Sequence, residues 1–229
     1  MTHWLAIANF IKEALLWRRR WRYLLLEEFF GAVCGSRGGC GVGVPGMSEE
    51  WVVRNCAPTL AGLKTGSLFS CPCPRREALV QELRELNGQL LGKGLRIVPL
   101  RLSHGRALLY LYRPGRLQSD MGHALARQLL RERGYDPQDS GRCVVQLMRR
   151  LRAGEEFPHE IGLFLGYPPE DVRGFIDHGA RDCKCVGCWK VYGDVEAARR
   201  QFSQFEKCTR IYCKQWRRGK DIRHLAVAG

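Results

Sequence analysis

The sequence predicts an α+β fold, in which a small sheet of about four strands is packed by helices that are grouped along the chain. Two apolar-rich runs, 95–102 and 106–112, are joined by a short turn and predict a β-hairpin over residues 95–112. After this hairpin, helical patterns follow one another over 116–179 with no strand between them. Grouped helices of this kind are typical of α+β proteins and not of alternating α/β proteins.

Before the hairpin, the pattern predicts helix, strand and helix. A first helix covers 48–57 and stops near Pro58, because proline lacks the backbone donor that a helix needs. A strand covers 65–69, and the Cys-Pro-Cys-Pro segment at 71–74 is expected to be irregular for the same reason. The helix that follows begins at Arg75 and has four leucines on one face: Leu79, Leu83, Leu86 and Leu90.

After the hairpin, the helices are separated by glycine and proline. The predicted helical segments are 116–133, 139–153, 158–166 and 169–178. A strand over 188–192 then precedes a long helix over 194–218, which Asp194 caps. The buried stripe of that helix is expected to contain Val195, Ala198, Phe202, Phe205, Thr209, Tyr212 and Trp216.

Residues 1–46 differ in composition from the rest of the chain. Tryptophans surround the arginines of 18–22, and a glycine-rich stretch without a helical period follows over 31–46. Met47 opens a Met-Ser-Glu-Glu-Trp segment that is typical of a natural N-terminus, with acidic residues in a first helical turn. We therefore expect translation to start at Met47, so that 1–46 is an extension and 47–229 a single α+β domain. The intact mass of the natively expressed protein tests this expectation.

The charge and the cysteines limit the class of protein. Lysine and arginine total 37 against 23 acidic residues, a net charge of +14 that favours anionic partners such as nucleic acid, anionic lipid or phosphorylated small molecules. The 11 cysteines are odd in number and no secretory signal precedes them, so we expect reduced thiols in the cytoplasm. No uncharged apolar run reaches the roughly 20 residues that a membrane-spanning helix needs.

Three segments resemble a known family. They are CAPTLAGLKTGSLF at 56–69, FPHEIGLFLGYPPEDV at 157–172 and WKVYGD at 189–194. Together they resemble a bacterial family known as domain of unknown function 3793, over about residues 48–226. The resemblance implies a cytoplasmic protein that begins near Met47, and it implies no activity. The cysteines at 183–188 are not part of the family pattern.

A site for an anionic ligand is predicted around the second and third segments. His159 and Glu160 lie in the first turn after Pro158, where free backbone N–H groups and the helix dipole attract anions and keep a histidine neutral for acid–base work. Lys190 and Tyr192 share one face of the predicted strand. The expected catalytic pair is His159 and Glu160, and the expected ligand-binding residues are Lys64, Tyr167, Lys190 and Tyr192.

This site leads to the main functional expectation, a cytoplasmic domain that binds an anionic small molecule or cofactor near His159 and Lys190. In the simpler interpretation, Glu160 caps the helix or forms a salt bridge, and His159 bonds a neighbouring loop. The sequence spells out no nucleophile–base pair, so it predicts binding and specifies neither a reaction nor a cofactor.

Cysteines near the third segment suggest a second type of site. Cys183, Cys185 and Cys188, with His178, provide three thiols and an imidazole, which is a sufficient set for tetrahedral zinc. The protein would then be a metal- or redox-responsive module, since Cys185 and Cys188 also form a Cys-x-x-Cys pair. The simpler interpretation is that these cysteines pack as small apolar residues.

Basic residues of two predicted helices suggest nucleic-acid binding as a third function. Tyr212 and Trp216 could stack on bases, but both lie on the predicted buried stripe and are expected to belong to the core. The basic residues are Arg149, Arg150, Arg152, Arg199, Arg200, Lys207, Arg210, Lys214, Arg217 and Arg218.

Overall fold

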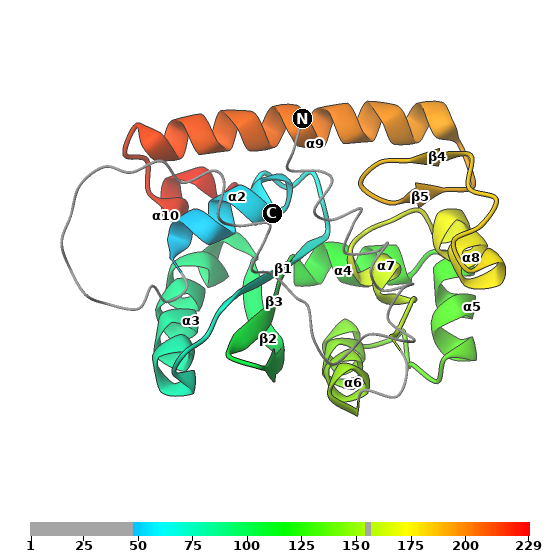
Figure 1. Ribbon diagram of the computed structural model, residues 1–229, viewed down its shortest axis with the longest axis horizontal. Coiled ribbons are helices and arrows are strands. Elements are labelled where there is room, and N and C mark those ends of the chain that lie inside the picture. The colour runs from blue at the N-terminus through cyan, green and yellow to red at the C-terminus, as the bar shows by residue number, and fades with distance from the viewer. Residues whose placement is uncertain (1–47, 154–156) are drawn as a thin grey trace. The chain divides into compact units, whose positions relative to one another are not determined.

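The computed structural model describes residues 48–153 and 157–229. The predicted extension, 1–46, lies outside the described residues. Contacts divide the chain into Met1–Val44 and Pro45–Gly229, and only the second unit is considered below. It contains a three-stranded sheet, a two-stranded sheet and a majority of helical residues, which confirms the α+β class (Figure 1).

The three-stranded sheet is antiparallel, in the order β1-β3-β2. Its strands are β1 (Gly66–Pro72), β2 (Arg96–Ser103) and β3 (Arg106–Tyr112). The predicted hairpin is confirmed as β2–β3. Its turn is tight because His104 and Gly105 both have positive φ angles, 50° and 68°, as a two-residue turn of the I′ type needs.

The strand predictions need two corrections. The strand expected over 188–192 is only β5 (Lys190–Val191), and it pairs with β4 (Cys185–Val186) in a separate two-stranded sheet. In addition, β1 continues through Pro72, opposite Arg106, where an irregular segment was expected. Proline is tolerated there because β1 is an edge strand, and the missing N–H does not interrupt a ladder on both sides.

The main core lies between this sheet and two helices that precede and follow β1. These are α2 (Glu49–Leu60) and α3 (Arg76–Leu90), and a short 3-10 turn, η1 (Leu91–Lys93), follows α3. The four predicted leucines of α3 are all buried. α2 was expected to stop near Pro58 but continues for two more residues, because a proline in the last turn removes the donor of a single carbonyl, that of Arg54, an exposed residue.

A series of helices follows the hairpin. The predicted helix over 116–133 is two helices, α4 (Pro114–Met121) and α5 (Ala124–Glu132), since Gly122, a poor helix former, ends the first. The next three helices are α6 (Ser140–Ala153), α7 (Ile161–Phe164) and α8 (Pro169–His178). α7 is much shorter than the predicted 158–166, which matters for the site described below.

The long helix α9 (Val195–Arg217) is capped as predicted, because the Asp194 side chain accepts a hydrogen bond from the Ala197 N–H at 2.9 Å. The N-terminal end of α9 lies beside the β4–β5 sheet (Figure 1). Its C-terminal part lies along α2 and leads toward α10 (Ile222–Leu225). Ala198 and Phe205 of its predicted stripe are buried, and the other five predicted residues are half-buried. None of the described helices is long and apolar enough to cross a membrane.

One buried cation joins the ends of several elements. Arg113, only 5% exposed, follows β3. Its guanidinium donates hydrogen bonds to the carbonyls of Thr59 at 2.8 Å, Leu60 at 2.8 Å and Val227 at 2.7 Å, and to that of Lys93 at 3.3 Å. Arg113 therefore ties the end of α2 and the segment after α10 to the sheet.

Candidate functional site

The three segments that carry the family resemblance meet in the structure. The first segment ends in the turn and strand around Lys64, the second includes Tyr167, and the third begins at Trp189. The Lys64 ammonium lies 5.3 Å from the centre of the Tyr167 ring, and that ring stacks on Trp189 at 4.8 Å. Residues more than 120 positions apart in the sequence therefore form one cluster, which we call the Lys64 cluster: Cys56, Lys64, Tyr167, Cys188, Trp189 and Phe205.

Close backbone approach holds the first two segments together. Gly166 has a φ of +73°, and a Cβ there would lie 2.5 Å from the Thr65 hydroxyl oxygen. The Thr65 hydroxyl donates to an Asp120 carboxylate oxygen, and the Tyr110 hydroxyl donates to the Phe164 carbonyl at 2.5 Å. The Gly166–Thr65 approach places the turn before β1 against the residue that precedes Tyr167, and the two hydrogen bonds tie that turn to α4 and β3 to α7.

Lys64 is a half-buried cation without an acidic partner. Its ammonium faces the rings of Tyr167 and Phe205, with the latter 6.0 Å away, and the nearby thiols belong to Cys56 and Cys188. Within 48–153 and 157–229, no carboxylate lies within ion-pair distance of it. Burial disfavours the charged form and lowers the pKa of Lys64.

The thiols beside Lys64 are protonated at neutral pH. Burial raises the pKa of the Cys188 thiol to about 12, although the Lys64 charge opposes this shift. Burial also raises the pKa of Cys56 and of the Tyr167 hydroxyl, which lies 3.3 Å from the Cys188 carbonyl and donates to it. The neighbours of the Lys64 ammonium are therefore neutral, and none of them compensates its charge.

Asp171 is a buried residue that the sequence prediction missed. It is only 3% exposed, and its carboxylate accepts three hydrogen bonds of 2.7 Å, from the Trp189 indole N–H and from the backbone N–H groups of Tyr192 and Gly193. Asp171 thus holds β5 and the following turn against α8. The sequence offered two acids in the first turn of α8, Glu170 and Asp171, but no signal for which one points inward.

Glu160 forms a buried ion pair, as the simpler interpretation expected. It is 1% exposed, accepts a hydrogen bond from the Tyr135 hydroxyl at 2.9 Å and pairs with Arg150 at 3.0 Å. The Arg150 guanidinium also lies over the Tyr135 ring, 5.6 Å from its centre. Burial and the Glu160 charge together raise the pKa of Tyr135. The Glu160 carboxylate is thus engaged inside the protein and does not face a ligand.

The anion site predicted at the start of α7 requires correction. α7 has only four residues, so its dipole is small. The N–H groups of Ile161, Gly162 and Leu163 are bonded to the carbonyls of the turn before the helix, at 3.0, 3.3 and 3.0 Å. They are not free to hold an anion. The His159 ring packs against the rings of Phe175, at 5.1 Å, and Phe157, at 6.0 Å.

Lys190 and Tyr192 have partners different from those of Lys64. The Lys190 ammonium donates to the Ala180 carbonyl at 2.7 Å. Tyr192 stacks on His178 at 5.7 Å over Gly174, where a Cβ would lie 2.4 Å from the tyrosine ring. In the described part of the chain, the Tyr192 hydroxyl is the one buried side-chain polar atom without a hydrogen-bond partner. Two of the six predicted site residues, Lys64 and Tyr167, lie in contact with each other.

The predicted metal set is not assembled. Cys188 is buried beside Lys64, whereas Cys183 and Cys185 are half-buried in the loop after α8 and in β4. His178 is exposed and lies 3.8 Å from Asp182. Among the described residues, no group of three or more His, Cys, Asp or Glu side chains is placed so that it could hold a metal ion. All nine described cysteines are free thiols.

The predicted basic surface divides into two parts. Arg150 of α6 forms an ion pair with Glu160, and the Arg152 side chain donates a hydrogen bond to the Leu100 carbonyl at 3.4 Å. The basic residues of α9, in contrast, are all exposed. Tyr212 and Trp216 are half-buried and pack against the main core, as expected from their place on the apolar stripe.

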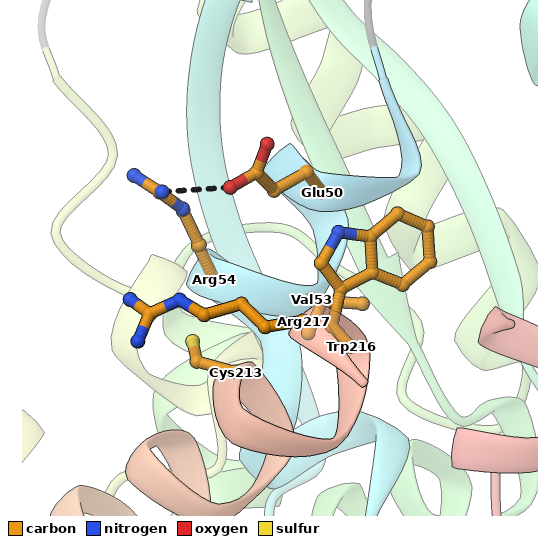
Figure 2. Close-up of a pocket in the computed structure, with 6 residues that line it drawn as sticks. All are labelled: Glu50, Val53, Arg54, Cys213, Trp216 and Arg217. Atoms are coloured by element: carbon orange, nitrogen blue, oxygen red, sulfur yellow. Dashed lines mark ion pairs between the residues drawn. The ribbon is translucent and has the colours of Figure 1, made fainter. Parts of the chain in front are cut away.

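A shallow pocket lies where the end of α9 meets the start of α2. Figure 2 shows the Glu50–Arg54 ion pair, of 2.6 Å, on one side and Cys213 beneath the arginines of both helices. Burial raises the pKa of Cys213, and the charges of Arg54 and Arg217 oppose that shift. The residues that line it are Glu50, Val53, Arg54, Cys213, Trp216 and Arg217.

The fold and these contacts define a small α+β protein in which Lys64, Tyr167 and Asp171 join the three-stranded sheet to α8 and the two-stranded sheet. The chain belongs to the family described as "Protein of unknown function (DUF3793)", whose model matches residues 52–226. No curated protein and no solved structure matches the chain.

Proposed function

We propose that the chain binds a small anionic molecule, through a carboxylate or phosphate group, at the Lys64 cluster. The supporting observation is a half-buried ammonium without an acidic partner at the point where the three family segments meet. An unpaired charge in such a place costs free energy, and an anion that reaches it removes that cost. The proposal keeps the ligand class expected from the sequence and moves the main contact from His159 and Lys190 to Lys64.

The surroundings of Lys64 suit anion binding more than acid–base catalysis. Aromatic rings exclude water and lower the local dielectric, so a charge–charge contact is stronger there than in bulk water. The two thiols stay neutral and do not compete with an incoming anion. Glu160 is held by Tyr135 and Arg150, so in this proposal it supports the turn before α7 and does not transfer protons.

Thermal unfolding with added anions tests the proposal. Inorganic phosphate and succinate are titrated into the wild-type protein, Lys64→Met and the matched control Lys93→Met, since Lys93 is likewise half-buried and its ammonium forms no ion pair within the described residues. At an anion concentration of about 100 Kd, a single site adds about 2.7 kcal/mol, which raises Tm by several degrees. We expect this rise in the wild type and in Lys93→Met, and none in Lys64→Met. An equal rise in all three proteins would exclude the Lys64 site.

We also propose that the protein works in the cytoplasm. The nine free cysteines of the described residues, four of them half-buried rather than buried, are typical of a reducing compartment. Fractionation of cells that express the protein at its native level tests this. Recovery with the cytoplasmic fraction is expected, and recovery in the culture medium with oxidised cysteines would contradict it.

A further inference from the structure

The exposed face of α9 carries a dense stripe of cations. α9 buries Ala198, Phe205 and Cys208, and its opposite face is open to solvent. Every basic side chain on this face is exposed. We call these residues the α9 stripe: Arg199, Arg200, Lys207, Arg210, Lys214, Arg217 and Arg218.

Helix geometry places these side chains on one line. At 3.6 residues per turn, the seven positions fall within an arc of about 100°, on the side opposite the Phe205 position. From Arg199 to Arg217 the helix rises about 27 Å, since each residue adds about 1.5 Å, and Arg218 follows directly as its C-cap. The buried face anchors α9 along this length against α2 and, through Phe202, against Trp189 of the β5 region. The stripe is therefore a rigid array of positive charge.

Few carboxylates neutralise this array. Glu196 and Glu206 are the acidic residues of α9, and Glu196 is already paired with Arg199 at 3.2 Å. For the other six cations of the stripe, no ion pair is formed within the described residues. Six unpaired cations on one rigid helix produce a strong local potential for a polyanion.

We infer that the α9 stripe is a nucleic-acid-binding surface that contacts the phosphate backbone. Double-stranded nucleic acid carries one negative charge about every 1.7 Å, a linear polyanion that matches a linear array of lysine and arginine. Tyr212 and Trp216 pack against the core and do not reach bases. The stripe therefore contacts phosphates and does not distinguish base sequences. The surface is opposite to the face with Phe205, so it is independent of the proposed anion site at Lys64.

The same face is less suited to a lipid surface. Amphipathic helices that bind membranes insert apolar side chains beside their cations. The apolar side of α9 is covered by the protein, and of its large apolar residues only Ile211, at 46% exposure, is exposed. Binding to anionic lipid would therefore lack the insertion that makes it stable, which favours nucleic acid as the partner.

Salt-dependent binding with charge-matched variants tests this inference. Fluorescence anisotropy is measured with a labelled 30-base-pair DNA duplex and a 30-nucleotide RNA, on the full 229-residue chain, so that residues 1–46 are the same in every protein. The stripe variant carries Lys207→Gln, Arg210→Gln, Lys214→Gln and Arg218→Gln. The control carries Arg76→Gln, Arg84→Gln, Arg131→Gln and Arg149→Gln, exposed residues of other helices that give the same change in net charge.

We expect the stripe variant to lose at least tenfold in affinity at 0.1 M salt, and the control less than threefold. The slope of log affinity against log salt should flatten by about 0.9 for each lost duplex contact, hence by about two to four in the stripe variant. A variant that keeps the charge, Lys207→Arg with Arg210→Lys and Lys214→Arg, should bind like the wild type even if the glutamine variant is less stable.

Three outcomes would overturn the inference. The first is equal loss of affinity in the stripe variant and the control, which would indicate that net charge alone decides binding. The second is no binding of either nucleic acid by the wild type at 50 mM salt. The third is tighter binding of the wild type to phosphatidylserine vesicles than to DNA and RNA, with the stripe responsible, which would assign the surface to anionic lipid.

Discussion

Arg113 and Lys64 are two cations without carboxylate partners, and their surroundings differ. The Arg113 guanidinium donates to four backbone carbonyls, whereas the Lys64 ammonium faces two aromatic rings. A buried cation that donates four of its five N–H groups to backbone carbonyls stabilises the fold. A cation whose donors are not used costs stability and is able to bind something else. The difference indicates a structural role for Arg113 and supports the binding role that we propose for Lys64.

The largest expected effect on stability comes from replacing Arg113, whose guanidinium is bonded to backbone carbonyls. Arg113→Met removes the donor of the Val227 carbonyl and one of the two donors of the Thr59 and Leu60 carbonyls, which also accept from the Gly62 and Val227 N–H groups, and it weakens the contact between α2 and the segment after α10. We expect the free energy of unfolding to fall by about 3–5 kcal/mol, measured by urea denaturation. Arg84→Met, on the exposed side of α3, should change it by less than about 0.5 kcal/mol. Equal effects of the two substitutions would remove the structural role of Arg113.

Asp171 adds a buried anion to the comparison, since both of its carboxylate oxygens accept hydrogen bonds. In Asp171→Asn, one oxygen becomes an NH₂ group that opposes a donor, either the Trp189 indole N–H or the two backbone N–H groups. The expected loss is about 2–3 kcal/mol, with a changed near-ultraviolet circular dichroism signal from Trp189. Glu170→Gln is the matched control, because Glu170 is exposed in the same turn. A stable Asp171→Asn protein with an unchanged signal would contradict the role of this carboxylate.

The sequence predicted those parts of the structure that depend on neighbours along the chain. The leucine face of α3, the β2–β3 hairpin and the Asp194 cap each follow from residues within a few positions of one another. Contacts between distant residues were not predictable in this way. Glu160 was a candidate acid or base until the structure placed Tyr135 and Arg150 beside it.

Pro72 and Gly122 also show that local sequence patterns do not fix every boundary of a helix or strand. Pro72 was expected to end regular structure, but its effect depends on whether β1 is an edge strand, and sheet order is a property of the whole fold. Gly122 interrupts a helical pattern that is otherwise continuous, and periodicity alone did not indicate the break between α4 and α5. For the candidate site, the sequence supplied Lys64 and Tyr167, and the fold decided that they meet while Lys190 has another partner.

Because the pKa of Lys64 is lowered, the difference in stability between the wild-type protein and Lys64→Met depends on pH. At pH values between that lowered pKa and 10.5, the unfolded chain holds a proton on Lys64 that the folded chain has lost, so the wild-type protein becomes more stable as the pH rises. Lys64→Met removes this titration. Its stability relative to the wild type should therefore be highest below the lowered pKa and should decline as the pH rises, in urea titrations kept below about pH 8, because thiols of the unfolded chain ionise around pH 8.5. A difference that grows with pH would contradict the unpaired, desolvated state of Lys64.

The free energy of unfolding of Lys64→Met at neutral pH, without added anions, tests the binding role of Lys64 most directly. A lysine retained for ligand binding is costly in the free protein, so the methionine variant should be more stable than the wild type by about 1 kcal/mol, because methionine fills the same space without a charge. Lys93→Met should leave the stability unchanged within about 0.5 kcal/mol. If Lys64→Met is instead destabilised by about 2 kcal/mol or more, Lys64 is a structural residue like Arg113, and the proposed anion site is contradicted.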